Sequence, residues 1–426
     1  MSKELLRAPR GTSDILPDDQ KYWKYVENIF LKIAIKYGFN RIETPVIEQS
    51  NLFTRGVGEF TDIVEKETYT FNDRGGDSLS LRPEGTAPVC RSYLEHGMQN
   101  LPQPIRLFYQ FPMYRYERPQ AGRYREFRQA GIEIIGEYSP LVDLEVIQFA
   151  CELVSELGLS DLDLIINSIG DDKCRNNYIS DLKTYYQNRI SELSHLDCQR
   201  RLDSNTLRLL DCKDINCQKL IKNAPKSLDY LCESCLIHWN ELLEYLDQLG
   251  IDYKIDTTLV RGFDYYTKTV FEIIPKDQGS QSTILAGGRY DGLIEQIGGQ
   301  STPGIGFAIG LDRVIMKLKL ESKDEISSND DNVRCFVAHN GDDAKKFAIK
   351  VVTKLRDNGI RSVLGSPSRS LKSQMKYASS IKALYSIIIG EDELRSEILT
   401  LRDMVDSKQE KLDLNQIIEK INRVKI

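Results

Sequence analysis

The sequence predicts an α+β protein with two domains, a long amino-terminal domain built on an antiparallel sheet and a small carboxy-terminal α/β domain. Three observations support this expectation. The chain of 426 residues is too long for one ordinary core, while 41% hydrophobic and 28% charged residues are typical of a globular protein. Strand patterns dominate the first part of the chain, and helix and strand patterns alternate in the last part.

The amino-terminal domain is expected to open with an amphipathic helix over 17–37. Pro17 stands in its first turn, one face is apolar, and Gly38 ends it. Strand patterns follow with short polar breaks and few intervening helices, which favours antiparallel pairing. The expected strands are 41–49, 68–73, 79–84, 106–117 and 125–136.

A helical insertion is expected at about 172–250, a polar segment that carries most of the chain's nine cysteines. Further along, residues 320–332 have little hydrophobic content and no helix or strand period. We therefore expect a first domain at 1–325, a linker at 326–332 and a second domain at 333–426.

The second domain alternates strand and helix patterns. Asp342 and Asp343 open one helix, and Gly359 ends it. Such alternation implies a sheet layered with helices. The expected strands are 334–339, 361–365, 385–390 and 397–404, and the expected helices are 342–358, 371–383 and one at the carboxyl end.

Composition and charge indicate where in the cell the protein works and which kinds of partner it binds. The amino terminus has charges and a proline where a signal peptide needs an apolar run, and no stretch reaches the length of a membrane span, so we expect a cytoplasmic protein with no membrane partner. Nine irregularly spaced cysteines favour reduced thiols. The net charge is −6, but residues 333–426 hold 18 basic and 12 acidic side chains. A basic end of this kind is typical of a nucleic-acid surface or of a solvated helical face.

The stretch RYERPQAGRYREFRQAGIEIIG, which begins at Arg115, predicts a hairpin with a basic loop. Because side chains alternate faces along a strand, Phe127, Gln129 and Glu133 share one face of the second arm. Arg115 and Glu117, two residues apart on the first arm, likewise lie on one face of that arm. Guanidinium, ring, amide and carboxylate in this order suit an extended ligand with phosphates, a purine and an amino group. The alternative is an exposed, solvated hairpin.

Three further stretches bear on the same ligand. LRPEGTAPV places Glu84 and Thr86 on one face just before a helix pattern, and VRGFDYY has a tight turn at Gly262 directly after Arg261. STPGIGFAIGLDRVI leads through glycines into a helix that carries Arg313. The glycine spacing in that stretch is one residue longer than a dinucleotide fingerprint, so we expect its glycines to let a helix press against a sheet.

Together these residues resemble class II aminoacyl-tRNA synthetases and, within them, the histidyl-tRNA synthetase family. The hairpin stretch resembles motif 2, GIGFAIGLDRV resembles motif 3, and GFNRIETPVIEQSNLF resembles the dimer-forming motif 1. LVRGFDYY and AGGRYDGLI resemble the two signatures peculiar to the histidine enzymes. The resemblance covers nearly the whole chain. Tyr116 and Phe263 depart from the histidine and leucine common in the family, and neither stands at an implied contact.

The resemblance implies a class II antiparallel catalytic domain followed by an anticodon-binding domain. It also implies a reaction in two steps, in which the histidine carboxylate attacks the α-phosphate of ATP and the acyl group of the adenylate then passes to the histidine tRNA. ATP, Mg²⁺, L-histidine and that tRNA are the implied partners, and a homodimer is the implied assembly. No enzyme nucleophile is needed, which agrees with only four histidines and no convincing Ser/His/Asp arrangement.

The same resemblance implies a role for individual residues. Arg261 and Arg115 would be the catalytic residues, acting at the α-phosphate. ATP contacts are implied for Arg115, Glu117, Arg123, Phe127 and Arg313. Histidine contacts are implied for Glu84, Thr86, Arg115, Gln129, Glu133, Arg261, Tyr265 and Tyr266. Gln120 would approach the tRNA acceptor end.

Two alternatives stay open on the sequence. The regulatory subunit of ATP phosphoribosyltransferase shares the catalytic fold, but it characteristically lacks the anticodon-binding domain and loses residues of the histidine signatures, and this chain keeps both. In the insertion, Cys212-x4-Cys217 and Cys232-x2-Cys235 are spaced as the four ligands of a structural zinc site. The other interpretation of these cysteines is buried or free thiols.

Overall fold

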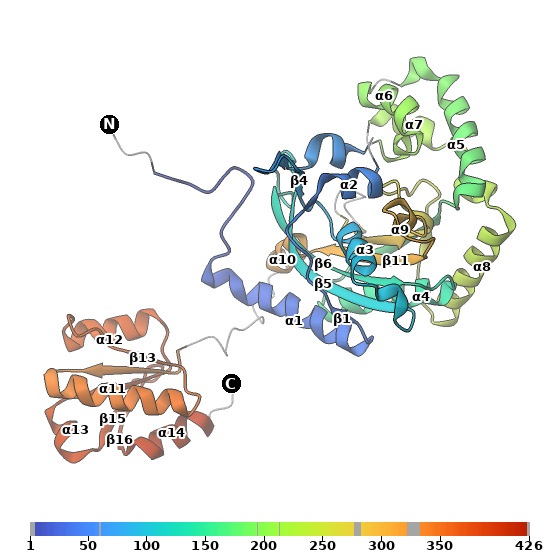
Figure 1. Ribbon diagram of the computed structural model, residues 1–426. Coiled ribbons are helices and arrows are strands. Elements are labelled where there is room, and N and C mark those ends of the chain that lie inside the picture. Colours follow the sequence, from blue (N-terminus) through green and yellow to red (C-terminus); the bar gives the residue numbers. More distant parts are fainter. Residues whose placement is uncertain are drawn as a thin grey trace. The chain divides into compact units, whose positions relative to one another are not determined.

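The structure is a computed structural model that describes residues 5–58, 61–193, 195–212, 214–276, 283–321 and 333–423. The chain divides into two compact units, Met1–Lys323 and Asp324–Ile426 (Figure 1). The expected linker at 326–332 lies outside the described residues. Among the described helices, none is long and apolar enough to cross a membrane.

The first unit is built on an eight-stranded sheet with the order β1-β5-β6-β11-β10-β9-β7-β8. The strands are β1 Asn40–Arg41, β5 Ile105–Tyr114, β6 Glu126–Ile135, β7 Leu162–Ser168, β8 Lys254–Ile255, β9 Thr267–Pro275, β10 Leu285–Arg289 and β11 Gly304–Gly310. All pairings from β5 to β7 are antiparallel, and parallel pairing occurs only where β1 meets β5 and β8 meets β7. The predicted antiparallel sheet is therefore confirmed.

Helices cover both faces of this sheet. On one face α1 (Gln20–Lys36) and α4 (Pro140–Glu156) pack on it, with Phe30 against Phe108 of β5 and Phe149 against Phe307 of β11. The next residue along β5, Tyr109, points to the other face, where it shares a buried cluster with α2 (Ser50–Gly56), α3 (Thr86–Glu95) and α9 (Leu293–Gln296). The expected helix over 17–37 is observed as a 3₁₀ turn at Pro17–Asp19 followed by α1.

One expected strand, 41–49, is wrong because it divides in two. Pro45 cannot donate to a strand ladder, and the chain leaves the large sheet after β1 to enter a small sheet as β2 (Ile47–Gln49). There it pairs in the order β2-β4-β3 with β4 (Ser78–Leu81) and β3 (Thr70–Asn72). The buried guanidinium of Arg82 donates to the carbonyls of Thr44 at 2.6 Å and Pro112 at 2.9 Å, so it joins the two sheets at this break.

The insertion leaves and rejoins the large sheet at one edge. It starts directly after β7 and ends before β8, and these two strands pair with each other. Its helices are α5 (Asp172–Gln187), α6 (Leu196–Ser204), α7 (Ile215–Ile221) and α8 (Glu233–Gln248). It has a hydrophobic cluster of its own, which includes Tyr178, Leu182 and Leu202. A small core of this size favours additional means of stabilisation.

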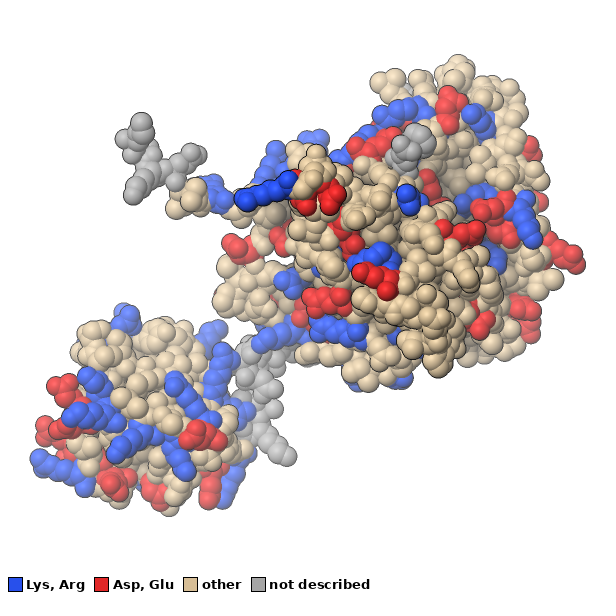
Figure 2. Space-filling model, in the orientation of Figure 1, with Lys and Arg blue, Asp and Glu red and all other residues tan. Residues whose placement is uncertain are grey.

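The second unit has a five-stranded sheet in the order β13-β12-β14-β15-β16. Its elements are β12 Cys335–His339, α11 Asp342–Asp357, β13 Ser362–Leu364, α12 Leu371–Ser380, β14 Tyr385–Ile389, α13 Glu391–Ser396, β15 Leu399–Asp403, β16 Gln409–Leu412 and α14 Leu414–Arg423. The predicted alternation is observed, and α13 and β16 are additions. Lys and Arg side chains are spread over the visible face of this unit in Figure 2.

A buried ionic cluster joins the insertion to the large sheet. Asp143 of α4 pairs with Arg289 of β10, and neither side chain is exposed to solvent. His238 of α8 lies with Nε2 2.8 Å from Asp143 Oδ2, and Thr269 of β9 donates to the same oxygen at 2.6 Å. Four elements that are distant in sequence therefore share one carboxylate.

We expect Asp143→Ala to lower the free energy of unfolding of the first unit by about 3 kcal/mol, because it leaves Arg289 buried without its main counter-charge. Urea unfolding followed by tryptophan fluorescence measures this unit alone, since both tryptophans, Trp23 and Trp239, belong to it. Asp163→Ala is the matched control, because its partner Lys254 is mostly exposed, and the expected loss is under about 1 kcal/mol. Equal losses would contradict the assignment.

Candidate active site

A cavity of 250 Å³ lies in the first unit, between the β5–β6 hairpin, the start of α3, the segment before β9, and the start of α10 (Leu311–Leu320). Most residues that the sequence singled out line it together. They are Glu84, Thr86, Arg115, Glu117, Arg123, Phe127, Gln129, Arg261, Tyr265, Tyr266 and Arg313. The cavity therefore brings arginines, aromatic rings and carboxylates from separate parts of the chain into one space.

The hairpin supplies one cationic wall of the cavity. Arg115 is anchored through Nε, which donates to the carbonyl of Pro83 at 2.8 Å, and its guanidinium lies 5.1 Å from the ring centre of Phe127. Glu117 stands between two arginines, 3.8 Å from Arg115 and 3.5 Å from Arg123. The partners fix the position of Arg115, while Arg123 stays half-exposed at the cavity edge.

Arg313 closes the cavity on the side of α10. Its Nε donates to the carbonyl of Gly122 at 3.0 Å and its Nη1 to the carbonyl of Thr283 at 2.8 Å. Gly122 has a φ of +73°, a backbone conformation that glycine adopts without strain. The hairpin loop is thus held to the first turn of α10, and Arg313 faces the same cavity as Phe127.

Arg261 forms a buried ion pair with Glu272 of β9. Burial alone would lower the pKa of Arg261, but the Glu272 carboxylate together with Tyr266 and Tyr265 outweighs it and holds the pKa above its usual value. The Arg261 Nε is buried and makes no hydrogen bond among the described residues. A donor of this kind, fixed in place and without a partner, is suited to an anionic ligand in the cavity.

The opposite end of the cavity contains a buried carboxylate and hydroxyl groups. Glu133 accepts hydrogen bonds from Thr86 at 2.8 Å and Tyr290 at 2.7 Å, and Tyr109 donates to it over 3.4 Å. Burial raises the pKa of the Glu133 carboxyl to about 8, although the hydroxyl donors oppose this shift. Glu133 does not line the cavity itself, and Thr86 and Tyr290 stand between it and the open space.

The start of α3 is organised by Glu84. Its carboxylate accepts from the backbone N–H of Thr86 at 2.7 Å and of Ala87 at 2.9 Å, so it satisfies two of the unpaired donors at the helix start. Burial raises the pKa of Glu84, and these N–H groups partly offset the shift. Glu84 therefore positions Thr86, whose hydroxyl bridges to Glu133.

Gln120 lies outside the cavity lining. It forms a tight bridge with Arg123 through two backbone hydrogen bonds of 3.1 and 2.9 Å, at the tip of the hairpin loop. Sequence reasoning missed Tyr290 and Glu272, the direct partners of Glu133 and Arg261. Tyr290 lies within the stretch AGGRYDGLI, so that stretch was a signal for it. Glu272 lies within an ordinary strand pattern, and nothing in the sequence around it indicates a functional residue.

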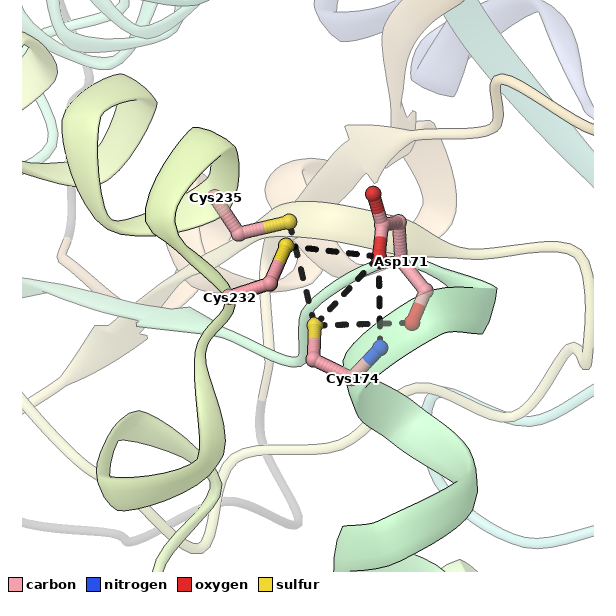
Figure 3. A group of neighbouring side chains, drawn as sticks. All are labelled: Asp171, Cys174, Cys232 and Cys235. Atoms are coloured by element: carbon pink, nitrogen blue, oxygen red, sulfur yellow. Dashed lines mark hydrogen bonds between the residues drawn. The ribbon is translucent and has the colours of Figure 1, made fainter.

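The grouping of Cys212, Cys217, Cys232 and Cys235 in one zinc site, which the sequence left open beside buried or free thiols, is wrong for the described residues. Cys232 and Cys235 meet Asp171 and Cys174 (Figure 3), while Cys212 meets His195 and Cys198. Cys217 lies beside Cys198, with 3.8 Å between the sulfur atoms. The helical fold of the insertion separates the two cysteine pairs, and linear spacing could not indicate which pairs come together.

Comparison with known proteins identifies relatives over the whole chain. A family model described as histidyl-tRNA synthetase matches residues 11–314, and one described as an anticodon binding domain matches residues 333–423. A histidine–tRNA ligase of Dehalococcoides mccartyi is 48% identical over 98% of this chain and 100% of its own length. The crystal structure of apo histidyl-tRNA synthetase from Staphylococcus aureus matches with a TM-score of 0.81 and 37% identity, covering 98% of this chain and 100% of its own.

A more distant structure bears on the alternative function. A protein of Bacillus halodurans, described as an ATP phosphoribosyltransferase regulatory subunit/histidyl-tRNA synthetase, matches with a TM-score of 0.65 and 24% identity, over 91% of this chain and 99% of its own. At this identity the likeness shows the fold alone. The two types of protein therefore share the architecture, and the residues of the cavity have to distinguish them.

We expect the stability of a Glu133→Gln variant, relative to wild type, to rise with pH between about 5 and 8. The carboxyl pKa lies near 4.5 when unfolded and about 8 when folded, so in this window the folded wild type holds one more proton and loses stability as pH rises. Glutamine does not titrate. The difference in urea midpoint, measured at several pH values by tryptophan fluorescence, should therefore grow with pH. A constant difference would mean that folded Glu133 is ionised throughout.

Proposed function

The chain belongs to the histidyl-tRNA synthetase family, and we propose that its cavity activates histidine with ATP for transfer to the histidine tRNA. The chain is accordingly an enzyme with the class II synthetase fold and a separate anticodon-binding domain. One observation carries the site assignment. A single cavity joins fixed arginines and an aromatic ring at one end to a hydrogen-bonding network of buried acids and tyrosines at the other.

The arginine end suits the triphosphate of ATP. When the histidine carboxylate oxygen attacks the α-phosphorus, an O–P bond forms, the bond to the bridging oxygen breaks, and pyrophosphate leaves. Negative charge builds up on the phosphoryl oxygens, and preorganised cations stabilise it. Arg115 and Arg261 would act there, because their protein partners hold both in place. Arg123 would contact the outer phosphates, and Phe127 and Arg313 would enclose the adenine.

The carboxylate end suits the amino acid. Gln129 and Glu84 would accept from the ammonium group, and Tyr265 and Tyr266 would stand beside the ring. Glu133, through Thr86 and Tyr290, would set the direction of hydrogen bonds toward the imidazole nitrogens. A site that hydrogen-bonds both ring nitrogens leaves buried polar groups unpaired when an apolar side chain enters, and this discriminates strongly.

Glu117 would help to hold a magnesium ion that accompanies ATP. Glu117 offers a carboxylate oxygen, Oε2, that is buried without a hydrogen bond among the described residues. Magnesium sites on nucleotides commonly use one or two carboxylates together with phosphate oxygens. When bound, the ion neutralises charge on the pyrophosphate leaving group. Arg123, 3.5 Å from the same oxygen, would share this task.

The synthetase function is favoured over that of a regulatory subunit. A subunit that only senses histidine needs the amino-acid end of the cavity but no fixed cations for phosphate chemistry. In this chain Arg261 has a buried counter-ion, Glu272, that keeps it charged and in place. The chain also has the anticodon-binding domain at 333–423.

Three wider features belong to the same proposal. The second unit would bind the anticodon arm through its basic side chains, which outnumber acidic ones by 18 to 12 over 333–426. Gln120, at the tip of the hairpin loop, would approach the tRNA acceptor end. The chain would act as a homodimer through the segment GFNRIETPVIEQSNLF, and it would work in the cytoplasm.

We expect ATP–pyrophosphate exchange that depends on histidine and on none of the other standard amino acids, and we expect Arg261→Lys to lower its rate by about 10²-fold or more. Lysine keeps a positive charge for Glu272, so the fold is maintained, but it loses the planar fork that meets phosphate oxygens. The measurement is exchange at saturating histidine and ATP.

The matched control for this variant is Arg128→Lys. Arg128 lies on β6 between the cavity residues Phe127 and Gln129, but its side chain lies over Trp23 and pairs with Glu27 at 3.7 Å, outside the cavity lining. Its exchange rate should stay within roughly twofold of wild type, as expected for an exposed pair. A wild-type protein that binds histidine but shows no exchange would instead be a regulatory subunit.

We expect a chain that ends at residue 325 to keep its exchange activity but to lose about tenfold or more in kcat/KM for charging the histidine tRNA. The second unit has a separate hydrophobic core, so its removal exposes little of the first unit's core. Exchange activity in the same preparation is the control for folding. Unchanged charging would contradict a role of the basic unit in tRNA binding.

A further inference from the structure

We propose that the insertion holds a structural zinc ion at Asp171, Cys174, Cys232 and Cys235. One potential ligand atom from each residue lies within 4.8 Å of all the others. Figure 3 shows Cys232 and Cys235 at the start of α8 directed toward Cys174 and Asp171 at the start of α5. The metal site does not depend on the proposed function, whereas its effect on histidine binding rests on it.

The spacing of the ligand atoms matches a tetrahedral ion. With Zn–S bonds of about 2.3 Å and Zn–O bonds of about 2.0 Å, tetrahedral geometry separates two sulfurs by about 3.8 Å and a sulfur from an oxygen by about 3.5 Å. Cys174 Sγ lies 3.8 Å from Cys235 Sγ and 3.4 Å from Asp171 Oδ1. Cys232 Sγ lies 3.8 Å from the same oxygen. The side chains therefore stand close to their coordinating positions.

The backbone supports this arrangement. The ligands come in two pairs, each three residues apart and each in the first turn of a helix, with Asp171 and Cys232 at the N-caps of α5 and α8. Backbone N–H groups at a helix start favour anionic ligands such as thiolates. Gly170 has a φ of +69°, and a Cβ there would lie 2.4 Å from Cys174 Sγ, so only glycine leaves room for this thiol.

Metal coordination explains the group better than a disulfide or free thiols. Two sulfurs 3.8 Å apart are not bonded, since a disulfide bond is about 2.05 Å long. A disulfide would also use two of the three cysteines and leave the third without a role. Binding of Zn²⁺ instead replaces three S–H protons, which leave to solvent, and the carboxylate completes four ligands. Asp171 and Cys232 are partly exposed, so an ion can enter.

A zinc ion here would act on the histidine end of the cavity through a positioning residue. Arg175 directly follows Cys174, and its guanidinium donates to the carbonyl of Tyr266 and, at 3.5 Å, to that of Asp264. Both carbonyls belong to the segment RGFDYY that lines the cavity. By fixing the first turn of α5, the ion would fix Arg175 and with it the backbone of Tyr266.

The second cysteine group independently points to a second zinc site. We infer that His195, Cys198, Cys212 and Cys217 form a Cys₃His set. His195 Nδ1 lies 3.5 Å from Cys198 Sγ and 3.8 Å from Cys212 Sγ, close to the roughly 3.6 Å that tetrahedral Zn–N and Zn–S bonds require. Cys217 Sγ lies 3.8 Å from Cys198 Sγ but not within 4.8 Å of both other ligand atoms, so it would move inward to supply the fourth ligand. The three cysteines are buried within the insertion's own core.

The test is the zinc content of the full chain, purified without chelators and measured by inductively coupled plasma mass spectrometry. Wild type should hold two zinc ions per chain. Cys232→Ser combined with Cys235→Ser should lower this to one, and so should Cys198→Ser combined with Cys212→Ser. Cys151→Ser, in α4 outside both groups, is the matched control and should keep two.

The variant pairs separate the two sites. If zinc is near zero in wild type, both assignments are overturned. If only one variant pair loses zinc, the other site is overturned. Titration of denatured, chelator-treated wild type should find nine free thiols, and a value of seven with no zinc would mean a disulfide in one of the two groups and overturn both metal sites.

Two measurements on wild type remain decisive even where a variant fails to fold. Replacement of zinc by Co²⁺ should give the intense visible absorption of tetrahedral thiolate coordination, and its absence would overturn both sites. Removal of zinc should raise the KM for histidine in pyrophosphate exchange several-fold more than the KM for ATP, because Arg175 acts through Tyr266. Equal changes in both would overturn the positioning role of Arg175 while the metal sites stand.

Discussion

The space left free by two glycines, Gly306 on β11 and Gly131 on β6, is the constraint on which the cavity depends. Gly306 lies opposite Glu133 in the antiparallel register, and a Cβ on Gly306 would stand 2.0 Å from Glu133 Oε2. On β6 itself, a Cβ on Gly131 would stand 2.4 Å from Tyr109 Oη. The buried acid and ring occupy the space that these glycines leave free. Any larger residue would displace the groups that form the carboxylate end of the cavity.

This arrangement separates two electrostatic tasks within a small volume. At one end the charges are fixed, because Arg261 is locked to Glu272 and Arg115 is anchored to the Pro83 carbonyl. At the other end charge is suppressed, since burial raises the pKa of Glu133 to about 8 and turns the carboxyl into a hydrogen-bonding group at neutral pH. Fixed cations suit the charge that develops during phosphoryl chemistry, and a neutral polar network suits the selection of a ring.

The fold and most of the cavity could be predicted because they follow from local patterns. Alternation along 125–136 correctly placed Phe127 and Gln129 together on the cavity wall, and the same parity directs Glu133 to that side of the sheet. The alternation of side chains along a strand does not show how deeply a side chain is buried. Glu133 lies behind Thr86 and Tyr290 and does not itself line the cavity. Tyr290 directly follows β10, and the pairing of β10 within the sheet brings it next to Glu133. This pairing cannot be inferred from any single stretch of the sequence.

The cysteines were grouped wrongly for a related physical reason. Proximity in sequence suggested that Cys212 and Cys217 meet Cys232 and Cys235, but the partners of the latter pair come from the start of the insertion. α5 begins where β7 ends, and α8 has to run back along the sheet to reach β8, which lies parallel beside β7, so the N-terminal turns of α5 and α8 meet. A metal at that place would close the base of the insertion, in addition to the Asp143–His238 contact and the bonds from Arg175 to the carbonyls of Tyr266 and Asp264. The chain topology, rather than the spacing of its cysteines, therefore decides which residues share an ion.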